Sequence, residues 1–185
     1  MNMSEQSDNT VGGDLAGGNI TKHYYHPNSL ASEYLRELYQ KCLDEKNSET
    51  IKFAEKLDYY NSTMTGDVLG LEGKLEAAGR EDRLWYAKEA KEQYHKKLLK
   101  TATFSQATQE INIFLLSEVQ SSYLLNVYPL ICDDDNQTTV DHAVENLIVK
   151  SLLELLGINL LGFTSMDILG MLYFLTGNCH IKWTA

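Results

Sequence analysis

The chain is 185 residues long, the usual length of one domain with a short tail. Hydrophobic residues make up 43% and charged residues 23%, a globular composition that argues against an intrinsically disordered protein. Sixteen basic residues against 26 acidic ones give a formal charge of −10, which repels a phosphate backbone. Nucleic acid is therefore not an expected ligand.

The first 27 residues form a tail that we expect to stand apart from a helical domain at 28–185. The tail is rich in glycine and poor in large apolar side chains, so it cannot supply a core, and we expect it to be flexible or β-prone. Residues 1–10 are polar and acidic, which does not fit a signal peptide. The three cysteines, at widely spaced positions, form no disulfide or zinc pattern, which favours a cytoplasmic protein.

Apolar residues at helical spacing begin near Asn28 and predict an all-α fold, an irregular bundle of about six to seven helices. Leu30, Tyr34, Leu38 and Leu43 form the first apolar stripe, and Ile51, Phe53, Leu57 and Tyr60 form the second. The expected helices span 28–43, 49–60, 68–78, 81–100, 103–128, 138–157 and a last range that follows Thr164 and ends near Thr176. The chain then closes in a short extended segment.

Several residues predict where these helices begin and end. Gly79 and Gly157 are expected to stop the third and sixth helices, and Pro129 is expected to help end the fifth. Two pairs resemble capping boxes at the starts of the last two helices: Thr138 with Asp141, and Thr164 with Asp167.

One stretch, 147–175, is apolar enough to raise the question of a membrane span. Lys150, Glu154 and Asp167 divide it, Gly157 interrupts it, and its longest charge-free run is 155–166. A span needs about 20 predominantly apolar residues. We therefore expect a buried hairpin and no membrane span.

The tail contains one internal repeat, the pentads Gly-Gly-Asp-Leu-Ala at 12–16 and Gly-Gly-Asn-Ile-Thr at 17–21. Such units can place a tight turn and one apolar side chain each in register, which suits strands stacked from neighbouring chains. A flexible glycine linker fits the same residues equally well. The candidate assembly residues are Gly12, Gly13, Asp14, Leu15, Gly17, Gly18, Asn19 and Ile20.

No pattern in the chain predicts catalysis, a cofactor or a metal. The phosphate-binding loops GxxxxGK[ST] and GxGxxG are absent. A calcium loop starting at Asp134 would place Thr139 where the sharp turn needs glycine. Cys179 and His180 are adjacent, so in an extended segment their side chains point to opposite faces and share no proton easily. We expect His180 or Trp183 to pack the C-terminal segment onto the bundle, and we expect no enzyme activity.

A run of lysines predicts a basic strip on the fourth helix. Its members are Lys88, Lys91, Lys96, Lys97 and Lys100. Such a strip is more often a solvated face than a binding site, although it could dock an acidic partner.

The closing run Asp167–Trp183, which ends in Leu-Thr-Gly-Asn-Cys-His-Ile-Lys-Trp, resembles the last motif of C-terminal domains in bacterial ABC-three component systems. The segment Leu57–Lys100, with Gly-Leu-Glu-Gly-Lys-Leu at 70–75, resembles the same domain. The pentads are similar to glycine-aspartate motifs that precede domains in such systems. The resemblance spans most of 57–183.

This resemblance implies a role in antiphage defence, beside an ABC-type ATPase or other products of neighbouring genes. In that family the C-terminal domain is expected to connect an N-terminal effector to the complex, but the tail before Pro27 is too short for an effector domain. We therefore expect a non-catalytic adaptor or accessory subunit that binds proteins and can form a homo-oligomer. Its C-terminal candidate contact residues are Gly177, Asn178, Cys179, His180 and Trp183.

Two alternatives remain open. The chain could be a β-stacking signalling module that assembles through the pentads, with the bundle as cargo or sensor. A membrane-disrupting effector built on the 147–175 hairpin is the lesser alternative.

Overall fold

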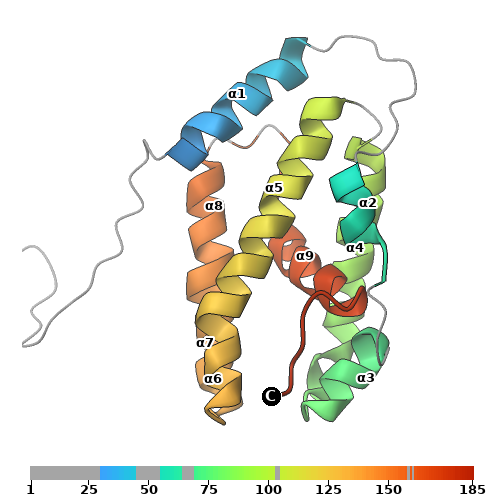
Figure 1. Cartoon of the computed structure of the whole chain (residues 1–185), viewed down its shortest axis with the longest axis vertical. Coiled ribbons are helices and arrows are strands. Elements are labelled where there is room, and N and C mark those ends of the chain that lie inside the picture. Colours follow the sequence, from blue (N-terminus) through green and yellow to red (C-terminus); the bar gives the residue numbers. More distant parts are fainter. Residues whose placement is uncertain (1–29, 45–54, 64–68, 103–104, 158, 160) are drawn as a thin grey trace, which may run out of the picture.

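The computed structural model of the chain describes residues 30–44, 55–63, 69–102, 105–157, 159 and 161–185. Their regular secondary structure is entirely helical, which confirms the predicted fold class (Figure 1). The α-helices are α1 (Leu30–Asp44), α2 (Glu55–Asn61), α3 (Gly70–Ala77), α4 (Leu84–Ala102), α5 (Gln106–Ser122), α6 (Tyr128–Cys132), α7 (Gln137–Ala143), α8 (Ser151–Leu156) and α9 (Ser165–Gly177). The tail with its pentads lies outside the described residues.

Helix α9 is the central element: it packs mainly along α4 and also contacts α3 and α5 (Figure 1). Nearly all of its side chains from Asp167 to Thr176 are buried. Gly170 sets its distance from α4, because a Cβ at this position would lie 2.4 Å from the carbonyl oxygen of Ala90 and 2.6 Å from Cβ of Tyr94. Glycine therefore permits the close approach of the two helices.

Two long helical runs contain π turns, which lie beside each other. The segment η2 (Tyr123–Val127) joins α5 to α6, and η3 (Val144–Lys150) joins α7 to α8. Ser122 links the two runs, because its hydroxyl donates a hydrogen bond of 2.9 Å to the carbonyl of Leu147. A π turn changes the usual backbone pairing, so such side-chain partners are expected.

The prediction that Pro129 ends the fifth helix is wrong. The helical run continues through η2 to Cys132, and Pro129 lies in the first turn of α6. A proline is tolerated there because it lies just after the π turn, where the usual backbone pairing is already altered. The predicted stops at Gly79 and Gly157 are confirmed, since both glycines have positive φ angles, +64° and +52°.

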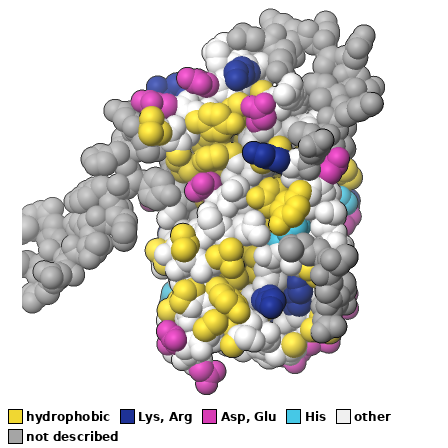
Figure 2. All heavy atoms as spheres, in the orientation of Figure 1, with side chains coloured by type: hydrophobic (Ala, Val, Ile, Leu, Met, Phe, Trp, Pro, Cys, Tyr) yellow, Lys and Arg dark blue, Asp and Glu magenta, His cyan; other side chains and the backbone are white. Residues whose placement is uncertain are grey.

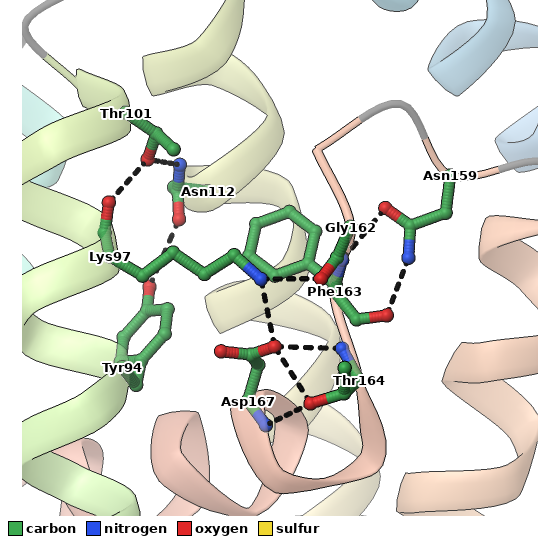
Figure 3. Close-up of polar contacts among 9 residues, drawn as sticks. All are labelled: Tyr94, Lys97, Thr101, Asn112, Asn159, Gly162, Phe163, Thr164 and Asp167. Atoms are coloured by element: carbon green, nitrogen blue, oxygen red, sulfur yellow. Dashed lines mark hydrogen bonds and ion pairs between the residues drawn. The ribbon is translucent and has the colours of Figure 1, made fainter.

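Of the two predicted capping boxes, the structure contains one. Thr164 and Asp167 bond reciprocally at the start of α9, and Lys97 donates to the Asp167 carboxylate at 2.8 Å (Figure 3). The box assigned to Thr138 and Asp141 is wrong, because Asn136 caps α7. Asp141 is held instead by two arginines, as described below.

The apolar stripes are confirmed in most of their described positions. Leu38, Leu57 and Tyr60 are buried, whereas Leu30 and Tyr34 were placed wrongly, being 85% and 40% exposed. The ring of Tyr34 packs edge-on against that of Phe114. The side chains of Leu43, Ile51 and Phe53 lie outside the described part. None of the described helices combines the length and apolar character that crossing a membrane requires.

Candidate functional site

The C-terminal segment that follows α9 is packed into the bundle. Trp183 is only 5% exposed, and its indole N–H donates to the hydroxyl of Thr176 at 3.0 Å. The hydroxyl of Tyr123 donates to the carbonyl of Lys182. The segment therefore folds back onto the last turn of α9, where Thr176 lies. This agrees with the packing role expected for Trp183.

Lys74, a buried lysine on α3, joins this helix to the end of α9 and to the segment that follows it. Lys74 donates to the carbonyl of Thr176 at 2.7 Å and to that of Ile181 at 3.0 Å. The first carbonyl lies in the last turn of α9, where the helix dipole favours a positive charge. Lys74 belongs to the Gly-Leu-Glu-Gly-Lys-Leu sequence, so that sequence holds the closing motif in place.

His180 packs against α2. It is 6% exposed, and its ring centroid lies 4.8 Å from that of Tyr59 and 5.5 Å from that of Tyr60. The neighbouring Asn178 donates to the carbonyl of Tyr60 at 2.8 Å. Burial lowers the pKa of His180 below its ordinary value, which favours the neutral ring.

The five C-terminal candidates thus all lie at the end of α9 and in the packed segment. His180 and Trp183 are buried, and Gly177, Asn178 and Cys179 are half-buried. Their visible contacts are within the chain, so their role in binding a partner stays a prediction. The eight candidates in the pentads lie outside the described residues.

The basic strip on α4 is largely neutralised by acidic neighbours. Lys88 pairs with Glu72 at 2.7 Å, Lys96 with Glu92 at 3.1 Å, and Lys97 with Asp167 at 2.8 Å. The last pair also fixes the loop before α9, since Lys97 donates to the carbonyl of Gly162 (Figure 3). These contacts favour a structural role over a dock for an acidic partner.

A cavity of about 490 Å³ opens beside Trp183. Aromatic side chains form one part of its wall: Tyr86 of α4, Tyr173 of α9 and Trp183 itself. Aliphatic side chains form another part: Val144, Val149, Leu153 and Leu169. Cavities of this size and composition commonly hold ligands.

The mouth of the cavity carries two ion pairs. Arg83 pairs with Asp141 at 2.7 Å, and Lys150 pairs with Glu145 at 2.8 Å. Arg80, which is buried, binds the second oxygen of Asp141 at 2.7 Å. The hydrogen bond and charge of Lys150 lower the pKa of Glu145, so this carboxylate is ionised at neutral pH.

Sequence reasoning did not find this cavity. Its wall comes from α4, α7, η3, α8, α9 and the C-terminal segment, which spacing along one helix cannot bring together. Asp141 was noticed only as a helix cap. The one usable signal was Trp183, which was expected to pack onto the bundle.

Large apolar side chains are exposed elsewhere on the bundle. Leu124, Leu125 and Leu147 lie on the two π segments, and Leu125 is 75% exposed. Figure 2 shows apolar side chains gathered on the lower part of the visible face, over the region of α6 and α7.

In the described part of the chain, no group of three or more His, Cys, Asp and Glu residues could hold a metal ion.

Comparison with known protein families gives a match. A family model described as C-terminal domain 9 of the ABC-three component (ABC-3C) systems matches residues 70–183. The matched range contains α3 to α9, the packed C-terminal segment as far as Trp183, and every residue that lines the cavity. Neither a curated protein nor a solved structure matches the chain.

Proposed function

The chain belongs to the C-terminal domain 9 family of the ABC-three component systems, and from this membership we propose that it is a non-catalytic adaptor subunit. It binds an ABC-type ATPase or another protein encoded beside it, and the complex acts in antiphage defence. The family name supports a place in a system of several components. The adaptor role, the partner and the defence activity are our proposal.

The observation that carries the adaptor role is the cavity beside Trp183. It lies wholly within the matched range, and it combines an apolar wall with a charged mouth. Protein interfaces commonly have an apolar centre with a polar rim. Tyr173 and Trp183 of the closing motif form part of this wall, which links the matched domain to a candidate contact surface.

Co-purification tests the adaptor role. The tagged full chain is expressed with the products of its neighbouring genes, and each complex is measured by size-exclusion chromatography with light scattering. We expect one neighbour to remain bound at micromolar concentration. A chain that elutes alone and monomeric beside every neighbour contradicts the proposal.

Phage challenge tests the defence role separately. Cells that carry all neighbouring genes are compared with cells that lack only this chain. Plaque numbers are expected to rise when the chain is removed and to fall again when it is supplied from a plasmid. Equal plaque numbers in both strains would contradict the defence role. They would not affect the adaptor role, which the co-purification experiment tests.

A further inference from the structure

Helix α2 is attached to the bundle on two sides. On one side it packs against α5, and its Leu57 and Tyr60 are buried. On the other side its C-terminal end meets the segment that follows α9, where Asn178 donates to the carbonyl of Tyr60 (Figure 1). Seven residues are too few for a helix to be stable in water without such contacts. The order of α2 therefore depends on the surfaces that it covers.

The contact with the C-terminal segment centres on a buried histidine. His180 is 6% exposed, and in the described part of the chain neither of its ring nitrogens has a hydrogen-bond partner. The rings of Tyr59 and Tyr60, both from α2, lie against it. Release of α2 would therefore open the imidazole to water. The C-terminal segment need not move, because Lys74 and the indole of Trp183 hold it at other points.

The surroundings of His180 oppose a positive charge on its ring. Burial lowers the pKa of His180, and the ammonium of Lys74 acts in the same direction. Carbonyl groups of Tyr59, Tyr60 and Ser62 favour the protonated ring, but they do not outweigh these effects. Protonation of the ring therefore costs more free energy while α2 is attached than after water has reached the ring.

Among the described residues, no anion compensates a charge on this ring. The titratable groups next to it are the tyrosine hydroxyls of α2, the ammonium of Lys74 on α3 and the thiol of Cys179 in its own segment. The charged Lys56 and Asp58 of α2 are exposed. Helix α5 contributes the neutral Gln120, which donates to the carbonyl of His180 at 3.4 Å, and its Glu118 has a pKa raised by burial alone.

We propose that protonation of His180 releases α2 from the bundle while α3 to α9 stay folded. Local opening of a short helix requires only the loss of its contacts with α5 and with the C-terminal segment. The range matched by the family model, 70–183, does not include α2, so its release leaves that domain whole. The release uncovers Asn178 and His180, two of the residues predicted to contact a partner. The inference does not depend on the proposed function.

Amide hydrogen exchange, measured by NMR on the full chain from pH 8 to pH 5, tests the release. At every pH, α2 should open about ten-fold or more readily than the most protected amides of α4 and α9, because it opens alone. After correction for the intrinsic pH dependence of exchange, its opening equilibrium should rise by a factor of about two to ten between pH 7.5 and pH 5.5. An opening equilibrium that does not change with pH overturns the inference. So does a helix α2 that opens only together with α4 and α9.

The ring of His180 provides an independent measurement in the unsubstituted chain. Its NMR signals report the pKa of this residue in the folded protein, which burial lowers. Opening of α2 should begin to rise near pH 6.5, the ordinary value, and should level off below the pH at which the ring titrates. A rise that begins only below that pH would assign the effect to another group, such as Glu118, and the inference would be wrong.

Matched substitutions identify the group that titrates. His180→Gln and His180→Phe both remove the titrating ring, and α2 opening should lose most of its pH dependence in either variant. His142→Gln, at an exposed position on α7, is the control and should keep the pH dependence of the unsubstituted chain. Full pH dependence in a folded His180 variant overturns the inference. If neither His180 variant folds, the comparison of α2 opening with the ring signals of the unsubstituted chain decides the question.

Discussion

Arg80 connects the mouth of the cavity to its aromatic wall. Its guanidinium carbon lies 4.9 Å from the ring centroid of Trp183, and its Nη1 lies 2.7 Å from a carboxylate oxygen of Asp141. A single buried side chain on the loop after α3 thus holds both the C-terminal segment and α7. Removal of its charge should loosen both.

We expect Arg80→Met to lower the free energy of unfolding by about 2 to 4 kcal/mol, through loss of a largely buried ion pair and of the contact with Trp183. Arg83 still pairs with Asp141, so the carboxylate does not become isolated. Urea unfolding measures the change. Arg36→Gln, at an exposed position on α1, is the control and should change stability by less than about 0.5 kcal/mol. Equal effects of both substitutions would contradict the connecting role of Arg80.

Lys74→Met should release the C-terminal segment from α3. The substitution nearly keeps the length of the side chain and removes the lysine donor from the carbonyls of Thr176 and Ile181, although the Thr176 carbonyl still accepts from the N–H of Cys179 at 3.2 Å. Loss of these charge-assisted hydrogen bonds should cost about 3 kcal/mol. Lys74→Met should increase the rate of amide hydrogen exchange in the C-terminal segment more than it does in α5. Lys56→Met on α2, where the lysine is exposed, should leave both rates unchanged. If the C-terminal segment of the variant exchanged as slowly as that of the unsubstituted chain, Lys74 would not be what holds the segment.

Gly170→Ala and Gly177→Ala form a matched pair on α9. A Cβ at position 170 would meet the backbone carbonyl of Ala90 at 2.4 Å, whereas one at position 177 would meet the end of the flexible Lys91 side chain at 2.4 Å. Backbone cannot move aside easily, so we expect Gly170→Ala to cost about 2 kcal/mol or more and Gly177→Ala much less. Thermal unfolding of the two variants measures the difference. The reverse order would contradict the close approach of α4 and α9.

The stability of the chain should depend on the protonation of His180. Its pKa in the unfolded chain is near 6.5, and burial lowers the value in the folded chain. Between the two values the unfolded state binds more protons, so stability falls as the pH decreases below about 6.5. The raised pKa of Glu118 also makes stability depend on pH, but it does so equally in His180→Phe and in the unsubstituted chain. The difference between the two proteins therefore isolates the effect of His180. Urea midpoints from pH 7 to pH 5 should decrease less in the variant; parallel curves would refute the prediction.

Deletion of residues 11–21 tests the pentads. If they drive β-stacked assembly, the shortened chain should lose assembly, because the repeated turn and apolar residue are removed together. The helical bundle should keep its unfolding midpoint. Light scattering measures assembly, and circular dichroism measures the bundle. Unchanged assembly would favour the linker interpretation of the tail.

The sequence predicted those features of the fold that depend on neighbouring residues. The second apolar stripe, the stops at Gly79 and Gly157 and the capping box of Thr164 are local patterns, and their described positions agree with the prediction. The first stripe was only partly correct, since Leu30 and Tyr34 are exposed. Pro129 was misread because the π turn before it, which alters the backbone pairing at this point, was not recognised from the sequence. The π turns were not predicted, because nothing in the spacing of the apolar residues marked them.

The candidate site was less predictable, because its parts are remote in sequence. Lys74 bonds the carbonyl of Ile181 across 107 positions, and Arg80 meets Asp141 across 61. Apolar spacing indicates which side of a helix is buried but not which helix covers it. A resemblance of the closing motif identified the family, whereas the role of Lys74 in holding that motif required the three-dimensional arrangement.

The π turns make the length of one segment matter as much as its composition. A π turn accommodates one more residue than the corresponding α-helical turn, so removal of one residue from 144–150 could restore regular α-helix. Every later position of that helix would then rotate by about 100°. Leu153 would turn away from the cavity although no lining residue had been replaced. Relatives that keep this cavity should therefore tolerate substitutions between Asn136 and Gly157 more readily than a change in the number of residues.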